Sequence, residues 1–176
     1  MVTGGTFVQA YNAQVSVDDT AQVIVALAVT NQPPDVEHFV PMLDRIKSGL
    51  GRLPERVSAD SGYYSNANAQ HCAARGIDAY IAVGRTPHGG EVALPRDSSP
   101  TKMQMRAKLE SPEGHAIYAR RKVIVEPVFG QIKSALGFRR FSLRGLAKVR
   151  CEWALVCLAH NLLKLFRFTR SRLLAA

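Results

Sequence analysis

One carboxylate stands alone in a strongly basic stretch of the sequence. Residues 117–150 contain nine lysines and arginines, and Glu126 is the only acidic residue in this stretch. If this stretch is helical, with about 100° between successive residues, Glu126 shares one arc of about 80° with Tyr118, Lys122, Phe129 and Lys133. A carboxylate flanked by cations suits a metal-binding acid set among phosphate-binding side chains. The same spacing suits a Lys122–Glu126 pair on a solvated helix, worth roughly 0.2–0.5 kcal/mol, and spacing alone leaves both interpretations open.

A second acid, Asp60, follows a short predicted strand at residues 56–59. In open α/β sheets, ligands gather just beyond the carboxyl ends of strands, and Asp60 occupies such a position. It is also followed by Ser61 and Gly62, a sequence typical of an ordinary Asx turn. The sequence supports the two interpretations equally.

Aromatic and basic residues alternate at positions 138–141, Phe-Arg-Arg-Phe. This pattern suits contact with nucleic acid, because rings stack on bases and arginines bind the backbone. Rings in such a pattern more often fill a protein core. We therefore favour core packing for Phe138 and Phe141, with Arg139 and Arg140 facing solvent.

The elements that position these residues follow from hydrophobic periodicity and turn residues. Strands are predicted at residues 11–17, 23–29, 56–59 and 78–83, and Asp18-Asp19-Thr20 is expected to form the tight turn between the first two. Helices are predicted at 36–48, with Asp35 as the expected cap, and at 66–75, 102–109 and 146–167. Residues 84–110, including the short helix, are assigned to an insertion loop, and residues 144–168 to a C-terminal helical region.

The helix that carries Glu126 has clear start and break signals. Ser111, followed by Pro112 and Glu113, is a favourable N-cap, first position and first-turn acid. Pro127 directly follows the carboxylate and lacks a backbone donor, so we expect the helix to kink or restart there.

Composition indicates one globular domain spanning residues 1–176. The chain is 47% hydrophobic and 21% charged, which excludes a disordered protein. No apolar run is long enough for a membrane span, and the first residues do not resemble an export signal, so we expect a cytoplasmic protein. The net charge is +9, with −3 in residues 1–60 and +12 in residues 61–176. This asymmetry favours a polyanion partner, most often nucleic acid.

Several of these motifs together resemble the DDE transposases of bacterial insertion sequences. The resemblance rests on residues 11–14 (Tyr-Asn-Ala-Gln), 59–63 (Ala-Asp-Ser-Gly-Tyr), 118–133, 137–140 (Gly-Phe-Arg-Arg) and 160–162 (His-Asn-Leu). These segments, in register, span most of the chain and are more specific together than any one alone.

The resemblance implies an α/β fold, with an RNase H-like mixed sheet flanked by helices and a C-terminal helical extension. It implies phosphoryl transfer on DNA at two divalent metal ions, usually Mg²⁺ (or Mn²⁺), held by two aspartates and one glutamate. By this resemblance Asp60 and Glu126 are catalytic metal ligands. The DNA-binding set becomes Tyr118, a base at Arg121 or Lys122, Lys133, Arg139 and Arg140.

One departure from the family pattern affects every functional expectation. The first catalytic aspartate of the family lies upstream of Tyr11, and none of the ten residues before Tyr11 is an acid. The strand carrying it is central in the order 3-2-1-4-5, so we expect a C-terminal piece without that strand, with a two-carboxylate site. Such a chain would be inactive alone.

Three functions remain open on these grounds. The first is a truncated transposase that acts on transposon ends and target DNA. The second is a non-catalytic DNA-binding remnant that assembles with another copy or with a full-length transposase and interferes with it. The third is a small basic structural protein whose acids serve only in turns and salt bridges.

Overall fold

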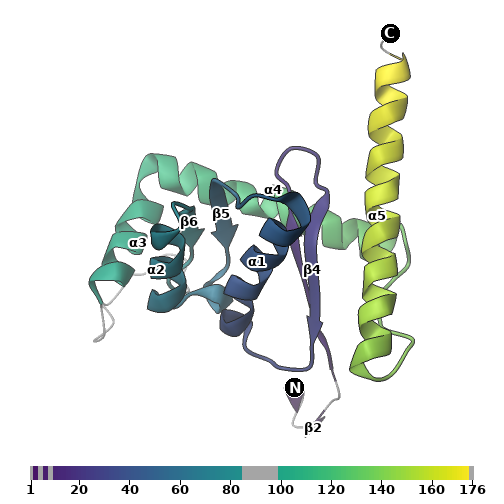
Figure 1. Cartoon of the computed structure of the whole chain (residues 1–176), viewed down its shortest axis with the longest axis horizontal. Helices are drawn as coiled ribbons and strands as arrows, with labels where there is room; N and C mark the ends of the chain where they lie inside the picture. The colour runs from purple at the N-terminus through teal and green to yellow at the C-terminus, as the bar shows by residue number, and fades with distance from the viewer. Residues whose placement is uncertain (1, 4–5, 8–9, 85–98, 175–176) are drawn as a thin grey trace. The chain divides into compact units, whose positions relative to one another are not determined.

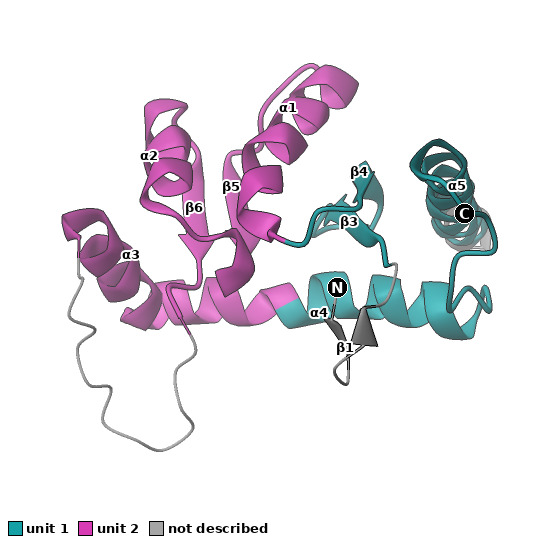
Figure 2. Ribbon diagram, turned by 90° about the horizontal axis from the view of Figure 1, so that it is seen from below, with its two compact units in different colours: residues 1–33, 122–176 teal, residues 34–121 magenta. Residues whose placement is uncertain are grey.

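The computed structural model describes residues 2–3, 6–7, 10–84 and 99–174, and side chains within 10–84 and 99–170. The chain forms two compact units (Figure 2). Unit 1 comprises residues 1–33 and 122–176, and unit 2 comprises residues 34–121. Each unit has its own strand pairing, and one helix, α4 (Pro112–Ser134), continues from unit 2 into unit 1 (Figure 1).

The sheet of unit 1 is the predicted hairpin. β3 (Asn12–Val17) pairs antiparallel with β4 (Ile24–Thr30), and its register runs from Asn12↔Thr30 to Val17↔Ile24. The Asp18 carboxylate accepts hydrogen bonds from the backbone N–H groups of Thr20 and Ala21, which confirms the expected turn. A separate two-stranded ladder joins β1 (Val2–Thr3) to β2 (Thr6–Phe7).

A hydrophobic core fixes the helices of unit 1 to this hairpin. α5 (Leu146–Leu174) packs against β4. The core is formed by buried apolar side chains from the hairpin, from the C-terminal part of α4 (Pro112–Ser134) and from α5. These residues are Ile24, Val29, Val128, Ile132, Val149, Trp153 and Cys157. Burial of this apolar surface is the main force that holds α4 and α5 in place within the unit.

Unit 2 is built on two parallel strands. β5 (Arg56–Ala59) pairs with β6 (Asp78–Ile81) in a register from Arg56↔Asp78 to Ala59↔Ile81. The helical elements are η1 (Asp35–His38), α1 (Phe39–Leu50), η2 (Ser61–Tyr63), α2 (Asn66–Ala74), α3 (Pro100–Glu110) and the first turns of α4. The apolar stripe predicted for the first helix is the buried face of α1, formed by Phe39, Met42, Leu43 and Ile46.

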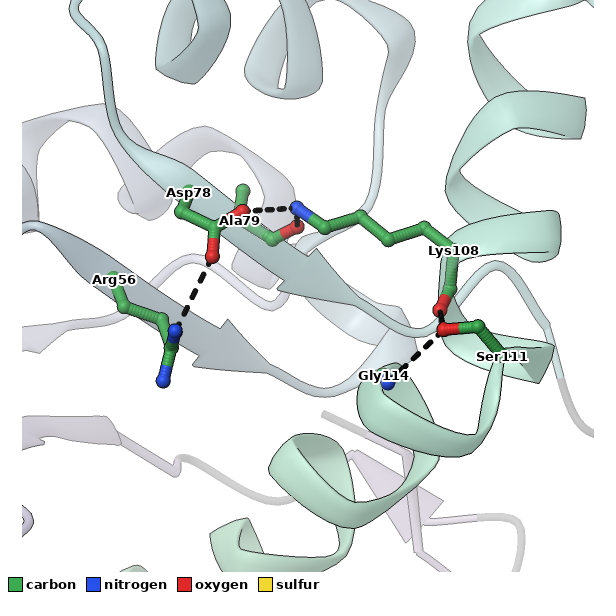
Figure 3. Close-up of polar contacts among 6 residues, drawn as sticks. All are labelled: Arg56, Asp78, Ala79, Lys108, Ser111 and Gly114. Atoms are coloured by element: carbon green, nitrogen blue, oxygen red, sulfur yellow. Dashed lines mark hydrogen bonds and ion pairs between the residues drawn. The ribbon is translucent and has the colours of Figure 1, made fainter.

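A polar cluster ties β5, β6 and α3 together (Figure 3). Lys108 of α3 donates to the Asp78 carboxylate and to the Ala79 carbonyl, and Arg56 of β5 donates to the other Asp78 oxygen at 3.2 Å. Burial alone would raise the pKa of Asp78, but the hydrogen bonds from Lys108 and Arg56 outweigh it and hold that pKa below its usual range.

The corner between α3 and α4 confirms the predicted helix start. Ser111 Oγ accepts from the Gly114 N–H at 3.0 Å and donates to the Lys108 carbonyl at 2.7 Å (Figure 3). Gly114 is required here, because an added Cβ would lie only 1.8 Å from the Lys108 carbonyl oxygen.

The mixed α/β class and the C-terminal helices are confirmed, with local differences. Part of the expected insertion loop, residues 85–98, lies outside the described residues, and the remainder from Pro100 is α3, two residues longer at its start than predicted. Asp35 is the first residue of η1 and Pro34 occupies the cap position, so Asp35 lies one position inside the helix start that it was expected to cap. Within the described ranges, β3 pairs only with β4 and β5 only with β6. No described helix is both apolar and long enough to cross a lipid bilayer.

Candidate functional site

Asp60 lies directly after β5, at the carboxyl end of a parallel strand in unit 2. Its side chain is half exposed and makes no capping hydrogen bond to the following turn. The backbone forms that turn, since the Tyr63 N–H donates to the Asp60 carbonyl at 3.2 Å. The carboxylate is therefore not used for an Asx turn, and its role as a metal ligand stays a prediction.

Arg121 of α4 is the cation beside this carboxylate. Its Nη1 lies 3.8 Å from Asp60 Oδ2, at the outer limit of an ion pair. The guanidinium also lies over the Tyr118 ring, 5.5 Å from its centroid. The Arg121 side chain is only 21% exposed. Its position within unit 2 suits a counter-ion for Asp60 better than a freely accessible phosphate contact.

A second carboxylate approaches Asp60 in unit 2, and the sequence did not identify it. A Cβ built on Gly62 would lie 3.0 Å from Asp35 Oδ2 and 3.5 Å from Asp60 Oδ1, so both acids approach one point that glycine leaves open. Burial raises the pKa of Tyr63 far above its ordinary value, and the charges of Asp35 and Asp60 raise it further. The only sequence signal was the glycine two residues after Asp60.

Glu126 lies in the part of α4 that belongs to unit 1. The helix continues through Pro127 as one element, so of the kink or restart expected there, the restart does not occur. Glu126 and Lys122 are both exposed, and among the described residues no salt bridge joins them. An ion pair between Lys122 and Glu126 therefore does not explain why an acid stands at position 126. Because Asp60 and Glu126 belong to different units, their meeting at one metal site stays a prediction.

The remaining predicted DNA contacts divide by exposure. Lys122, Lys133, Arg139 and Arg140 are exposed, and Tyr118 is half-buried. The rings at positions 138 and 141 pack against Trp153, with centroid distances of 6.1 and 6.2 Å. This confirms that these two rings complete the core while the arginines between them face solvent.

The available donors fit a hard divalent cation in kind. Asp35 and Asp60 offer carboxylate oxygens in unit 2 and Glu126 offers them in unit 1, and such ligands suit Mg²⁺ or Mn²⁺. Across residues 10–84 and 99–170, however, no group of three or more aspartate, glutamate, histidine or cysteine side chains is assembled into a metal site.

Comparison with known proteins gives one match. The family model described as Transposase DDE domain matches residues 2–162. No curated protein and no solved structure matches the chain. The family match confirms the resemblance drawn from the motifs, and the mixed α/β architecture with C-terminal helices agrees with the RNase H-like fold expected of such domains. Matched over all but its first residue and its last fourteen, the chain belongs to the transposase DDE domain family.

Proposed function

We propose that the chain is the part of a DNA transposase that performs phosphoryl transfer with Asp60 and Glu126 as its metal-binding carboxylates. The observation that carries this proposal is the position of Asp60 beyond the end of β5, with its carboxylate beside Arg121 of α4, the helix that also bears Glu126. The expected cofactor is Mg²⁺ or Mn²⁺, which when bound neutralises the charge that develops on the attacking and leaving oxygens of the phosphodiester. We place the protein in the cytoplasm, where bacterial DNA is found.

The residues of the chain would divide the work as follows. Asp60 and Glu126 bind the cation, and Arg121 holds the Asp60 carboxylate while Tyr118 supports the guanidinium. The exposed bases Lys122, Lys133, Arg139 and Arg140 bind DNA phosphates and keep the strand in register, because such contacts position DNA and carry little sequence information.

The direct test is metal-dependent nicking of DNA that contains transposon ends, measured with the chain co-expressed with the upstream segment proposed below, because the chain alone is expected to be inactive. Asp60→Asn and Glu126→Gln should each abolish nicking in Mg²⁺ and in Mn²⁺ without changing thermal stability. Glu110→Gln, which removes an exposed acid of α3 with no proposed role, is the matched control and should nick normally. Equal activity in all three variants would contradict the assignment of the two acids.

We further propose that the third carboxylate and a central strand are supplied by polypeptide outside these 176 residues, so that the chain alone is inactive. The support is the strand pairing: in the order 3-2-1-4-5, β4 and β3 correspond to strands 3 and 2, and β5 and β6 to strands 4 and 5. The reading frame immediately upstream should encode an aspartate-bearing strand. Co-expression with that segment should restore nicking, and aspartate-to-asparagine substitution in it should abolish nicking again.

A second candidate function is a subunit that assembles with another transposase chain and interferes with it. The observation that favours it is an exposed apolar stripe on α5, formed by Leu155, Leu158, Leu162 and Leu165. Their 3-4-3 spacing is that of a coiled-coil seam. The positions that flank the seam carry neutral residues although the chain has a net charge of +9, so two copies of the helix would not repel each other there. Inhibition of an active transposase by added chain, relieved in a Leu158→Ser/Leu165→Ser variant, would support this function.

A further inference from the structure

Pro127 leaves one backbone carbonyl of α4 without its helical donor. In an α-helix the N–H of each residue bonds the carbonyl four residues earlier, so the missing N–H of Pro127 would have bonded Val123. The Gln22 side chain occupies this place: its Nε2 donates to the Val123 carbonyl at 2.9 Å. Residues 101 positions apart in the sequence thus complete the hydrogen bonding of the helix directly before Glu126.

Gln22 is itself held in place by α5. Lys164 Nζ donates to Gln22 Oε1 at 2.6 Å, and His160 Nε2 lies 3.0 Å from the Gln22 carbonyl. A carbonyl can only accept, so His160 Nε2 carries the proton. His160 itself is fully buried.

The backbone of the hairpin is fixed at the same point. Asn161 of α5 accepts from the Ile24 N–H at 2.9 Å and donates to the Ile24 carbonyl at 2.8 Å. Gln22 has φ +57°, the only positive φ at a non-glycine position in the described part of the chain. A non-glycine residue keeps such a conformation only where its surroundings impose it. The contacts from His160, Asn161 and Lys164 supply that constraint.

Glu126 lies between this polar contact and a hydrophobic anchor. One turn before it, the Val123 carbonyl bonds Gln22, and directly after Pro127 the side chains of Val128 and Ile132 are buried in the core of unit 1. The course of α4 is therefore fixed on both sides of Glu126, by contacts that belong to one unit.

We propose that Gln22 is a positioning residue for Glu126: by bonding the carbonyl that Pro127 leaves free, it fixes the path of α4 and the direction of the Glu126 carboxylate. His160, Asn161 and Lys164 hold Gln22 for this purpose. The proposal deepens the proposed function and rests on Glu126 as a metal ligand. It also gives a role to the His160-Asn161 motif, which the resemblance had marked without explaining.

The Gln22–Val123 hydrogen bond is exposed, so water can replace it when the side chain is changed. Gln22→Met should therefore fold, and its thermal unfolding should confirm this. The decisive partner variant is Pro127→Ala, because alanine restores the helical N–H to the Val123 carbonyl and makes Gln22 dispensable.

The test is a double-mutant cycle of Gln22→Met and Pro127→Ala with two measurements. The first is hydrogen exchange in the α4 peptide spanning residues 118–134, and the second is the affinity for Mn²⁺ alone, measured from free Mn²⁺ by electron paramagnetic resonance. Gln22→Met should speed exchange around Val123 and weaken Mn²⁺ binding by about five-fold, the size expected for one hydrogen bond. In a protein that already carries Pro127→Ala, Gln22→Met should change Mn²⁺ affinity by less than two-fold.

Equal effects of Gln22→Met in both backgrounds, or no effect in the natural one, would overturn the proposal. Gln70→Glu, an exposed glutamine of α2, serves as the control and should change neither measurement. Glu126→Gln separates the two levels of inference. If it leaves Mn²⁺ affinity unchanged, the proposed function fails, whereas the exchange coupling between Gln22 and Pro127 still reports independently on the positioning contact.

Discussion

At the scale of single residues, the unresolved choice between two neighbouring bases becomes a testable difference. Lys122 is exposed, whereas Arg121 is mostly buried and lies beside Asp60. Lys122→Ala should reduce the slope of log affinity against log salt by about 0.9, because one phosphate contact is lost. Arg121→Ala should leave that slope unchanged. DNA-binding titrations at several salt concentrations measure the slope for each variant. A reduced slope in Arg121→Ala, with an unchanged slope in Lys122→Ala, would show that Arg121 is the base that contacts phosphate.

Two glycines of α4 should respond to alanine in opposite directions. At Gly114 the new Cβ would meet the Lys108 carbonyl oxygen at 1.8 Å, so Gly114→Ala should destabilise the fold by about 1–3 kcal/mol or more. At Gly130 nothing lies within 4 Å, and alanine should stabilise the helix by roughly 0.5–1 kcal/mol. Denaturant unfolding measures both changes. Similar unfolding free energies for the two variants would contradict the close approach at the α3–α4 corner.

The residues of the site show where sequence reasoning stops. Glu126 and Asp60 could be singled out because one is a lone acid among bases and the other follows a strand. Asp35 could not, because its proximity to Asp60 depends on how η1 and η2 pack, and its position suggested only a helix cap. The role of Gln22 could not be predicted either, because its partner is the backbone carbonyl of Val123, which is distant in the sequence.

At the scale of elements, Asp78 joins β5, β6 and α3 through one carboxylate. Its folded-state pKa is depressed, so its contribution to stability is complete above the unfolded value of about 3.9 and is lost as pH falls through the lower folded value. Asp78→Asn should cost roughly 0.2–1 kcal/mol at pH 7, because the carboxylate is partly exposed. Unfolding free energies of the two proteins, measured from pH 7 to pH 2, should converge at the acid end. A constant difference across that range would show that charge is not responsible.

Local signals predicted the elements well where they are strong. The hairpin turn at Asp18 and the capping serine at 111 appear as expected, because both depend on hydrogen bonds within a few residues. The path of α4 through Pro127 could not be predicted in this way. Local rules expect a kink or restart after proline; α4 does not restart, and a side chain from the hairpin bonds the freed carbonyl, a contact that no local rule predicts.

At the scale of the whole molecule, composition suggested one domain, and that assignment stays a prediction beside the two compact units. The units should unfold with separate midpoints, because each has its own buried core. Trp153, the only tryptophan, reports on unit 1, and far-UV circular dichroism reports on both. Ile132→Val should shift the fluorescence transition by about 1 kcal/mol, and Asp78→Asn should leave it in place. Coincident transitions that both variants shift together would indicate a single cooperative unit.

The strand pairing has a consequence for how the protein behaves in concentrated solution. β3 and β5 each have a partner on one side only among the described strands. Backbone donors and acceptors along such a row serve as a template for strands of other molecules, and native proteins usually shield them with charge, proline or bulges. At high concentration without a complementing segment, the chain should therefore grow cross-β fibrils that bind thioflavin T, and a short peptide that pairs with β3 or β5 should suppress them.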